Sequence, residues 1–377
     1  MNMMSPKMNQ IAVSLRADLA RAFDIVTPVV EKLKSYPILE NILIKGDGKT
    51  LFVMATDLDI EVCVALPAQA PFLSSITVPA KAMKAHLKSG KTAEYVTITP
   101  QNGNVAAVAL DSLNVSMATR SADEFPMLKR DFAKAARFTM SGAVLHDALD
   151  SVMGAISTEE TRYYLNGVYI HVVDGKLVMA TTDGHRLYKR VLDLPEGAEK
   201  MPGIILPRKS VATLHRLTKG KQCPAEVSLE ITELSGRFSF DNVTVTTKMI
   251  EGTFPDYERV TPKHNDKIAT LDAAAAIVGI NQVKPTTKDG AKAVKLTLGN
   301  NHCTLECRSA DDSSASTTIP VKFVENWFEI GFNCGYLLDM LTEAGGTVKV
   351  EFNDSGSPTV FTGQRNGWKG VLMPMRV

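Results

Sequence analysis

The sequence has no long hydrophobic run, few cysteines and almost no net charge. Among its 377 residues no apolar stretch reaches the roughly 18 residues that cross a bilayer. The first ten residues also lack the apolar core of a signal peptide. The five cysteines are scattered and odd in number, which is typical of reduced thiols. Together these absences predict a cytoplasmic protein.

The charge balance excludes an overall basic protein. The net charge is +1, from 42 basic and 41 acidic residues, so any basic surface must come from the local arrangement of Lys and Arg. Cys303 and Cys307 have strand spacing, but no second ligand pair with zinc spacing accompanies them. We therefore expect structural thiols, no metal and no cofactor.

Common catalytic motifs are also missing. The chain has no glycine-rich phosphate or dinucleotide loop, no GxSxG elbow and no HExxH. Asp183, His185 and Arg186 would be the candidates for an acid, a base and an anion clamp. A histidine beside a turn is more often a hydrogen-bonded structural residue. We therefore expect a non-catalytic protein, with an enzyme using Asp183 and His185 as the alternative.

What the chain does contain is a long internal repeat. MATTDGHRLYKR begins at Met179, and MATDLDIEV, from Met54, echoes its first half. Asp57 and Asp183 lie 183 − 57 = 126 residues apart, and a period this long indicates repeated domains. Each third shows two helical patterns and about six to eight strand patterns. The sequence predicts an α+β protein of three similar domains, each with two helices packed on antiparallel sheets, at 1–136, 137–265 and 266–377.

Basic residues recur on the second helix of the first two thirds. Pro79 and Pro207 each open such a helix, at an offset of 207 − 79 = 128 residues. In the first third the basic residues share one helical face and are Lys81, Lys84, Lys88 and Lys91. In the middle third they are Arg208, Lys209, Arg216, Lys219 and Lys221. A single such face is usually just solvated, but its recurrence predicts a positive lining that binds phosphates without reading bases.

The chain ends in an apolar segment, VLMPMRV, which starts at Val371. Val371 and Leu372 are predicted to close the last sheet as a terminal strand, whereas Pro374 interrupts a strand ladder. Methionines adapt to varied apolar partners. We therefore predict a pocket for short peptides beside the tail.

Several motifs, in order and along essentially the whole chain, resemble those of the bacterial DNA polymerase III beta subunit family, the DNA sliding clamps. They are ATDL from Ala55, RYYLNG from Arg162, TDGHRL from Thr182, PRK from Pro207, FPDY from Phe254, GFN from Gly331 and MPMR from Met373. The resemblance implies a head-to-tail homodimeric ring of six similar domains, with helices lining the hole and sheets outside. Duplex DNA would pass through the hole, and a polymerase tethered to the ring would synthesise DNA processively.

The resemblance also implies partners and a nucleoid-associated location. The partners would be double-stranded DNA bound without sequence preference, the DNA polymerase III alpha subunit, the clamp loader delta subunit, translesion polymerases, mismatch repair proteins and ligase. A hydrophobic cleft between the second and third domains would bind their peptides. Its residues would be Leu165, Thr182, Gly184, His185, Arg186, Leu187, Pro255, Val260, Asn333, Tyr336, Val371, Met373, Pro374, Met375 and Arg376.

The resemblance places a second set of residues near DNA. They are Arg162, Tyr163, Tyr164, Arg208, Lys209 and Arg216, to which we add Lys32, Lys34, Lys81, Lys84 and Lys88. Tyr163 and Tyr164 have a plainer interpretation as alternating strand residues, one of them in the core.

The chain also departs from the family pattern. KLKSYP, from Lys32, stands where clamps commonly have a proline-rich turn, so Lys32 or Lys34 would make the DNA contact there. Tyr188-Lys189-Arg190 is bulkier and more charged than usual and would alter the mouth of the cleft, and the chain ends in Val377, not leucine. The alternatives are a specialised clamp paralogue that serves a repair polymerase and a DNA-processing enzyme that uses Asp183 and His185.

Overall fold

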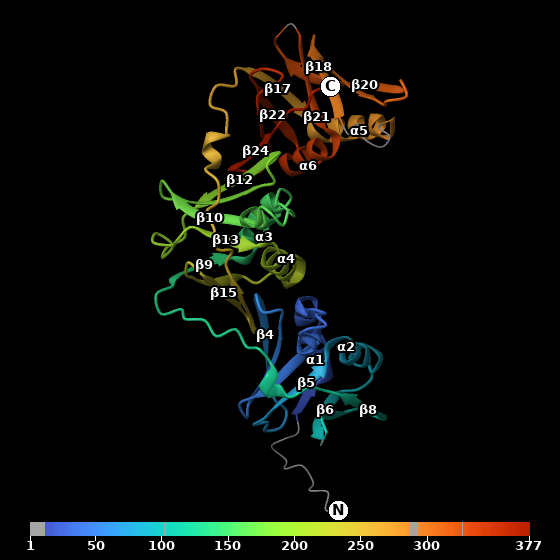
Figure 1. The fold of residues 1–377 in the computed structure, drawn as a ribbon, viewed down its shortest axis with the longest axis vertical. Helices are drawn as coiled ribbons and strands as arrows, with labels where there is room; N and C mark the ends of the chain where they lie inside the picture. The colour runs from blue at the N-terminus through green and yellow to red at the C-terminus, as the bar shows by residue number, and fades with distance from the viewer. Residues whose placement is uncertain (1–11, 102, 287–292, 326) are drawn as a thin grey trace, which may run out of the picture. The chain divides into compact units, whose positions relative to one another are not determined.

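The fold repeats one αβ arrangement three times along the chain. The computed structural model describes residues 12–101, 103–286, 293–325 and 327–377. Over these ranges each third contains two α-helices and eight β-strands (Figure 1). The prediction of an α+β fold with two helices and six to eight strands in each third is confirmed.

The elements of the three thirds correspond one to one. Those of the first third are β1 (Ala12–Leu15), α1 (Arg16–Val26), β2 (Asn41–Gly46), β3 (Thr50–Thr56), β4 (Ile60–Pro67), β5 (Ser75–Pro79), α2 (Ala80–Ser89), β6 (Tyr95–Gln101), β7 (Val105–Leu110) and β8 (Leu113–Ala118). Those of the middle third are β9 (Ala136–Ser141), α3 (Gly142–Met153), β10 (Gly167–Val173), β11 (Lys176–Thr182), β12 (Arg186–Asp193), β13 (Ile204–Pro207), α4 (Arg208–Leu217), β14 (Glu226–Ile231), β15 (Ser235–Phe240) and β16 (Val243–Lys248). Those of the last third are β17 (Lys267–Asp272), α5 (Ala273–Val283), β18 (Ala293–Gly299), β19 (His302–Arg308), β20 (Ser314–Phe323), β21 (Phe328–Asn333), α6 (Cys334–Ala344), β22 (Thr347–Phe352), β23 (Thr359–Thr362) and β24 (Trp368–Leu372).

Strand order is the same in every third. If the eight strands of each third are numbered along the chain, one four-stranded group has the order first, sixth, seventh, eighth. These groups are β1-β6-β7-β8, β9-β14-β15-β16 and β17-β22-β23-β24. The other runs fifth-second-third-fourth, as in β5-β2-β3-β4, β13-β10-β11-β12 and β21-β18-β19-β20. All of these neighbours are antiparallel, so each four-strand group forms a local antiparallel sheet.

A fixed rule joins one third to the next. The eighth strand of a third pairs with the fourth strand of the third before it. Thus β16 pairs with β4 through Val243↔Val64 to Thr247↔Ile60, and β24 pairs with β12 through Leu372↔Arg186 to Trp368↔Arg190. Two composite sheets result, one of eight strands and one of twelve, the latter including a β17–β20 link within the last third.

The chain accordingly divides into two compact units that do not follow the repeats. The first comprises residues 1–146, 196–202 and 212–249, and the second 147–195, 203–211 and 250–377. The middle third is shared because β9-β14-β15-β16 belongs to the sheet of the first unit and β13-β10-β11-β12 to that of the second. The domain boundaries predicted from the sequence therefore stay a prediction.

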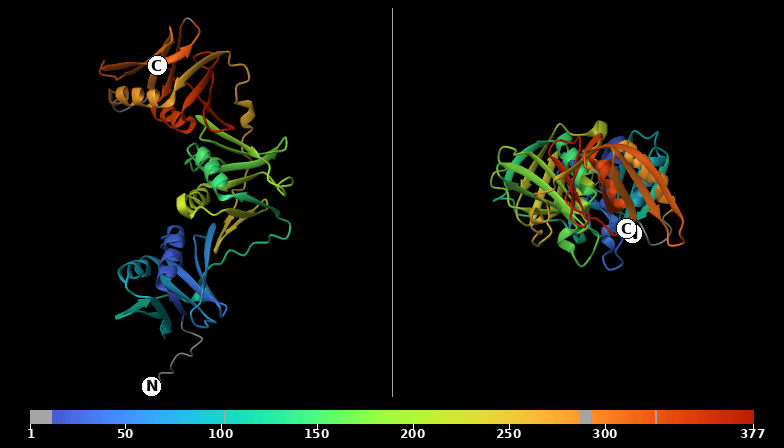
Figure 2. Two further views of the ribbon diagram at one scale, coloured as in Figure 1. Left: turned by 180° about the vertical axis from the view of Figure 1, so that it is seen from behind. Right: turned by 90° about the horizontal axis from the view of Figure 1, so that it is seen from above.

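The helices form because each has one apolar stripe that is buried beneath it. On α1 the buried residues are Leu19, Ala22, Phe23 and Val26, and on α6 they are Cys334, Leu337, Met340, Leu341 and Ala344. Helices α1 and α2 lie side by side in the first unit, as do α5 and α6 in the second (Figure 2). In the described ranges no helix is long and apolar enough to cross a membrane.

Two local predictions are wrong. Pro79 is the last residue of β5 and the cap before α2, not its first helical residue, because its ψ of 117° is extended. The segment Tyr163–Leu165 forms a 3₁₀ turn, and the strand that follows it, β10, begins only at Gly167. Tyr163 and Tyr164 are therefore not alternating strand residues; Tyr163 is exposed and Tyr164 is partly buried.

Tyr188-Lys189-Arg190, predicted to alter the mouth of the cleft, lies largely inside the fold, and its effect on the cleft stays a prediction. Tyr188 is fully buried against Trp368, with ring centroids 5.6 Å apart. Arg190 is buried and donates to the Asp147 carboxylate at 2.6 Å. Lys189 pairs with Glu258. The bulk and charge of this segment thus go into the core and into internal ion pairs.

Candidate functional site

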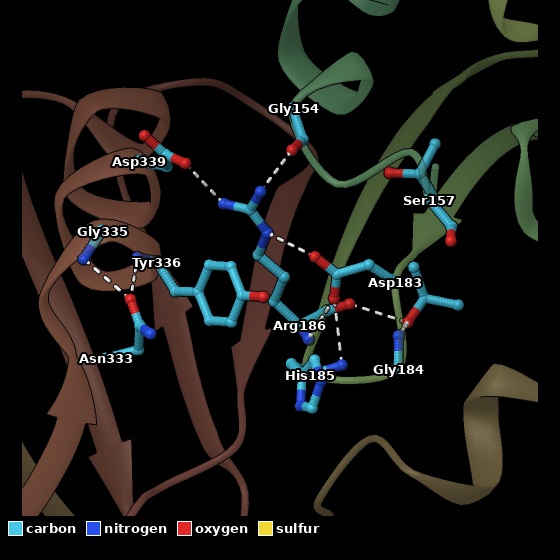
Figure 3. A network of polar contacts seen from close by, with 12 residues as sticks. Gly154, Ser157, Asp183, Gly184, His185, Arg186, Asn333, Gly335, Tyr336 and Asp339 are labelled. Carbon is cyan, nitrogen blue, oxygen red and sulfur yellow. Dashed lines mark hydrogen bonds and ion pairs between the residues drawn. The ribbon is translucent and has the colours of Figure 1, made fainter. Parts of the chain in front are cut away.

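The turn between β11 and β12 is held in shape by one carboxylate (Figure 3). Asp183 Oδ1 accepts hydrogen bonds from the backbone amides of His185 at 3.0 Å and Arg186 at 3.1 Å. Its Oδ2 accepts from Arg186 Nε at 3.0 Å. The side chain of Asp183 is only 16% exposed. Both oxygens accept hydrogen bonds within the turn, so this carboxylate fixes the shape of the turn.

Arg186 connects the turn to two helices. Its Nη1 donates to Asp339 Oδ2 on α6 at 2.7 Å, and its Nη2 donates to the carbonyl of Gly154 after α3 at 2.7 Å (Figure 3). Burial alone would lower the pKa of Arg186, but the hydrogen bond to Asp339 and the nearby Tyr188 and Asp183 outweigh it and raise the pKa. The guanidinium is thus a permanently charged internal link, not a free anion clamp.

Tyr336 stands beside this link in the first turn of α6. The side chain of Asn333 caps the helix by accepting hydrogen bonds from the amides of Gly335 at 2.9 Å and Tyr336 at 3.2 Å (Figure 3). The Arg186 guanidinium lies 4.5 Å from the centre of the Tyr336 ring, and the His185 ring stacks on Tyr336 at 5.8 Å. These contacts fix the aromatic ring in one place.

The C-terminal tail crosses the same region. After β24 ends at Leu372, the amide of Met373 donates to the carbonyl of His185 at 2.9 Å. The amide of Met375 donates to Gly331 on β21 at 2.8 Å, forming an isolated bridge. The predicted terminal strand is therefore confirmed for Val371 and Leu372, and beyond them the backbone is anchored while both methionine side chains remain exposed.

An apolar cluster lies beneath these groups. Its buried members include three of the predicted cleft residues and are Leu165, Val178, Ala180, Leu187, Ile205, Phe254, Tyr257 and Val371. Pro255 and Val260 flank the buried Tyr257 and are themselves exposed. A rigid polar turn, an oriented tyrosine and exposed methionines over an apolar cluster make a surface that can hold an extended apolar peptide.

A pocket of about 690 Å³ opens on the α6 side of the site. It combines the predicted residues Asn333 and Tyr336 with six that were not predicted, namely Asn281, Lys284, Pro285, Cys334, Gly335 and Asp339. Sequence reasoning also missed Gly154, whose contribution is a backbone carbonyl and so has no side-chain signal. Asp339 did have a signal in the sequence: it is an acidic residue on the second helix of the last third, where the second helices of the earlier thirds carry basic residues.

Arg162 lies at this site although it was predicted to face DNA. It donates twice to the Glu159 carboxylate at 2.7 Å and once to the carbonyl of Asp183 at 3.2 Å. The hydrogen bond from Arg162 lowers the pKa of Glu159. Gly184 makes this possible, because a Cβ there would lie 2.6 Å from Arg162 Nη1. Arg376, predicted for the cleft, is exposed at the chain end.

The other basic residues lie on helices and one loop. Lys32 and Lys34 are exposed before the 3₁₀ turn at Pro37, and Lys32 shares a groove of about 390 Å³ with Lys81 and Arg120. On α2, Lys81 and Lys88 are exposed, whereas Lys84 pairs with Asp24 of α1 at 2.8 Å.

The basic residues of α4 differ in how free their charges are. Arg208 is exposed and Lys209 is partly buried. Arg216 donates to the carbonyl of Ile25 at 2.8 Å. Burial lowers the pKa of the Arg216 guanidinium. Part of the predicted positive face is therefore occupied by internal contacts.

Glu343 is the most perturbed carboxyl near the site. Its Oε2 lies 3.4 Å from Arg365 Nη1, and Arg365 also pairs with Asp150 at 2.8 Å. Burial raises the pKa of Glu343 to about 7, with Arg365 opposing the rise and Asp150, Asp339 and Asp147 adding to it. Arg365 therefore has more carboxylates around it than it can neutralise.

The described residues contain no cluster of three or more His, Cys, Asp or Glu side chains arranged to hold a metal ion. Three repeats joined strand to strand, with exposed apolar side chains over a buried cluster at one joint, are typical of a repeated-domain clamp protein.

Comparison with known proteins makes this specific. The N-terminal, central and C-terminal domains of the DNA polymerase III beta subunit match residues 11–129, 139–256 and 258–376. The chain belongs to the DNA polymerase III beta subunit family.

Relatives and solved structures agree along the whole chain. The beta sliding clamp of Caulobacter vibrioides is 35% identical over 369 residues, covering 96% of this chain and 98% of the relative. That of Pseudomonas aeruginosa is 28% identical over 368 residues with the same coverage. The sliding clamp of Bartonella birtlesii, crystallised bound to griselimycin, has a TM-score of 0.91 and 31% identity and covers 98% of this chain and 100% of its own.

The function follows from the family. The chain is a sliding clamp that serves as a processivity factor for DNA polymerase, in a family whose members are non-catalytic.

Substitution at Gly184 should show that Arg162 holds the turn. Gly184→Ala places a methyl group on the Arg162 guanidinium and is expected to cost more stability than Gly175→Ala. Gly175 also has a positive φ, +67° against +91°, but a Cβ there would meet nothing within 4 Å. Both variants carry backbone strain of about 1–2 kcal/mol. The extra loss of stability in Gly184→Ala therefore measures how firmly Arg162 is held against the turn. Chemical denaturation of both variants gives the two costs.

The double variant completes this test. In an Arg162→Ala background the cost of Gly184→Ala should fall to that of Gly175→Ala. An unchanged cost would mean that Arg162 does not hold the turn.

The pKa of Glu343 should make stability depend on pH. A folded-state pKa above the ordinary 4.5 means that the folded chain binds the proton more tightly, so stability is lost as pH rises from 4.5 to about 7. With about 1.4 kcal/mol per pKa unit, the loss is at most about 3.5 kcal/mol, and solvent screening of this partly exposed carboxyl makes it smaller. Glu343→Gln should therefore be more stable than the natural chain at pH 8 and nearly equal to it at pH 4.5.

Thermal unfolding followed by tryptophan fluorescence across this pH range measures the effect. Glu226→Gln, at an exposed carboxyl, is the control and should leave the pH dependence unchanged. Parallel pH curves for Glu343→Gln and the natural chain would contradict the assignment.

Proposed function

We propose that the surface between Tyr336, the Asp183 turn and the C-terminal tail is the cleft that binds partner peptides. The observation that carries the proposal is the bonding of the tail to both sides of the site, through Met373 to His185 and through Met375 to Gly331. This anchoring holds two exposed methionines over the apolar cluster of Leu165, Leu187 and Val371. An apolar peptide side chain would be buried between them.

The remaining predicted residues have supporting roles in this proposal. Thr182 accepts a hydrogen bond from the amide of Gly184 at 3.1 Å and donates to the carbonyl of Arg186 at 2.7 Å, so it shapes the turn. Arg186 and Asn333 hold Tyr336. Pro255, Val260 and Arg376 would contact the peptide directly from exposed positions, and Pro374 from a half-buried one. A short peptide would bind with a Kd of about 1 µM, near −8 kcal/mol.

We further propose that two chains close into a head-to-tail ring, and the strand order supports this. Within a chain the eighth strand of one third pairs with the fourth strand of the third before it. Two strands are left over by this rule: β8, whose only neighbour in the described sheets is β7, and β20, which from Ser314 to Pro320 pairs only with β19. Pairing β8 of one copy with β20 of another extends the rule across copies and closes a ring of six repeats.

An exposed apolar residue supports the same interface. Helix α5 lies on β20, with Gly279 against Thr317 and Ile319 and a hydrogen bond of 3.1 Å from Thr317 to Gln282. Its neighbour Val278 is 58% exposed. An apolar side chain beside an unpaired strand edge is typical of a subunit interface.

Duplex DNA would run through this ring against the basic residues of the helices. The exposed Lys32, Lys34, Lys81, Lys88 and Arg208 are proposed to contact phosphates directly, since their charges face solvent. Lys84, Lys209 and Arg216 would add to the positive potential. Tyr163, exposed beside Arg162, would touch the backbone from the middle third, with Tyr164 behind it.

The three repeats would correspond to domains at 1–136, 137–265 and 266–377. The clamp would carry no catalytic activity of its own and would act in the cytoplasm at the nucleoid. Through its cleft it would bind the DNA polymerase III alpha subunit, the clamp loader delta subunit and, in turn, translesion polymerases, mismatch repair proteins and ligase.

Removing the tail side chains should weaken peptide binding. Pro374→Ala with Met375→Ala deletes apolar contact area but keeps the Met375 amide bond to Gly331, so Kd should rise at least tenfold, or about 1.4 kcal/mol. The probe is a fluorescent peptide carrying the clamp-binding motif of the alpha subunit, followed by fluorescence anisotropy.

Met127→Ala is the matched control, because Met127 is 41% exposed and Met375 is 38% exposed. The control should bind like the natural chain. Unchanged affinity in the double variant would rule out this cleft.

Charging the α5 surface should break the ring. Val278→Asp buries an unpaired carboxylate in the proposed interface, so sedimentation should show monomers at concentrations where the natural chain is dimeric. The same variant, placed on nicked circular DNA by a clamp loader, should be lost in a high-salt wash that the natural ring survives.

Val173→Asp is the control, at a 42% exposed residue of β10 outside both open edges. Linearising the circle should release the natural ring as well. If Val278→Asp still forms dimers, the proposed interface is wrong. If the natural chain is washed off circular DNA by high salt, it does not encircle the DNA.

A further inference from the structure

Two thiols meet just behind the α6 side of the site. Cys307 lies on β19, and Cys334 is the first residue of α6. Their sulfur atoms are 3.8 Å apart, and the residues are 0% and 1% exposed. A disulfide needs an S–S distance of about 2.05 Å, so the two thiols must approach by about 1.8 Å.

Their surroundings make the two thiols unequal. The hydrogen bond between the two thiols lowers the pKa of Cys334, and the charge of Lys284 and the backbone at the start of α6 act in the same direction against burial. The same hydrogen bond, together with burial, raises the pKa of Cys307. Cys334 is thus the more acidic thiol of the pair, and Cys307 the less acidic one.

Access is from one side. Cys334 is part of the wall of the 690 Å³ pocket that also contains Lys284, Asn333 and Tyr336. With so little of the residue exposed, only a small reagent can reach the sulfur. Hydrogen peroxide is such a reagent, and the thiolate is the form of a cysteine that attacks it.

We propose that Cys334 and Cys307 are a peroxide-reactive pair that forms a reversible disulfide beside the partner cleft. The Cys334 thiolate attacks one oxygen of hydrogen peroxide, the O–O bond breaks, and sulfenic acid and hydroxide form. The Cys307 sulfur then attacks the sulfenic sulfur, its proton leaves with the hydroxyl group as water, and the S–S bond closes. Peroxide is reduced by two electrons, and a dithiol reductant returns the pair to thiols.

The disulfide would act on the cleft through the helix start. Cys334 lies between Asn333, which caps α6, and Tyr336, whose ring stacks on His185 and Arg186. Drawing Cys334 towards β19 moves this first turn and therefore the tyrosine. This consequence rests on the proposed cleft, whereas disulfide formation does not.

Mass spectrometry of the intact, folded chain tests the pair. Treatment with hydrogen peroxide should give a species 2 Da lighter that is restored by dithiothreitol, and digestion without reductant should yield a linked peptide containing Cys307 and Cys334. In Cys307→Ser the same treatment should instead leave a sulfenic acid on Cys334, which dimedone captures when the peroxide is removed and the chain is then unfolded in its presence.

Cys303→Ser is the matched control. Cys303 is fully buried on the same strand, but its sulfur bonds only to the carbonyl of Thr304, at 3.9 Å, in the described structure. This variant should form the disulfide at the natural rate. The proposal is overturned if the folded chain keeps its mass, if another pair is linked, or if linkage appears only in denaturant.

Peptide anisotropy on the oxidised and reduced chain tests the second consequence separately. Oxidation should change Kd at least threefold, and Cys307→Ser should remove the change. If the disulfide forms but the Kd of the peptide does not change, the redox pair is confirmed and its proposed effect on the cleft is overturned. Failure of the tail variants with an intact Cys307–Cys334 link would instead point to a wrong cleft.

Discussion

The backbone pairing of β12 with β24 is the constraint on which the site depends. Five residue pairs, from Arg186↔Leu372 to Arg190↔Trp368, merge a strand of the middle third with the last strand of the chain. This register sets the Asp183 turn opposite the start of the tail and brings Arg186 to α6. Because a shift of one residue would turn every side chain to the other face, the site depends on this exact pairing. Trp368 secures it by donating to the carbonyl of Ser151 on α3 at 2.8 Å.

Charge adds orientation to this framework. Arg186 satisfies Asp183, Asp339 and Gly154 from one planar group, a geometry that a lysine cannot reproduce. A buried arginine with two carboxylates contributes little to stability on balance, because its desolvation offsets its attraction. Its effect here is to hold the Tyr336 ring in a single orientation. The site is thus rigid at its polar end and adaptable at its methionines, which suits a surface with several partners.

Much of the fold could be predicted from the sequence because its signals are local and repeated. The apolar stripe of α6, the cap Asn333 and the echo between Asp57 and Asp183 all report on short stretches of chain. Strand pairing across repeats carries no such signal, so the β4–β16 and β12–β24 joints could not be derived. Tyr188 shows the limit most plainly: it looks like surface bulk in the sequence, yet the joint to β24 buries it against Trp368. For the site, motif resemblance supplied most of the residues, while the contacts of Arg162 with Glu159 and of Arg186 with Asp339 are seen only in the folded chain.

The junctions between neighbouring repeats of the proposed ring differ in whether a covalent chain connection crosses them. Where β4 meets β16, and where β12 meets β24, the chain itself runs across the boundary through residues 119–135 and 249–266, so those seams are tethered when they part. The seam between β8 and β20 has no such tether, since its strands belong to different chains. A loader that has to pass DNA into the hole would therefore open the ring between β8 and β20, because this junction can separate without breaking a covalent bond.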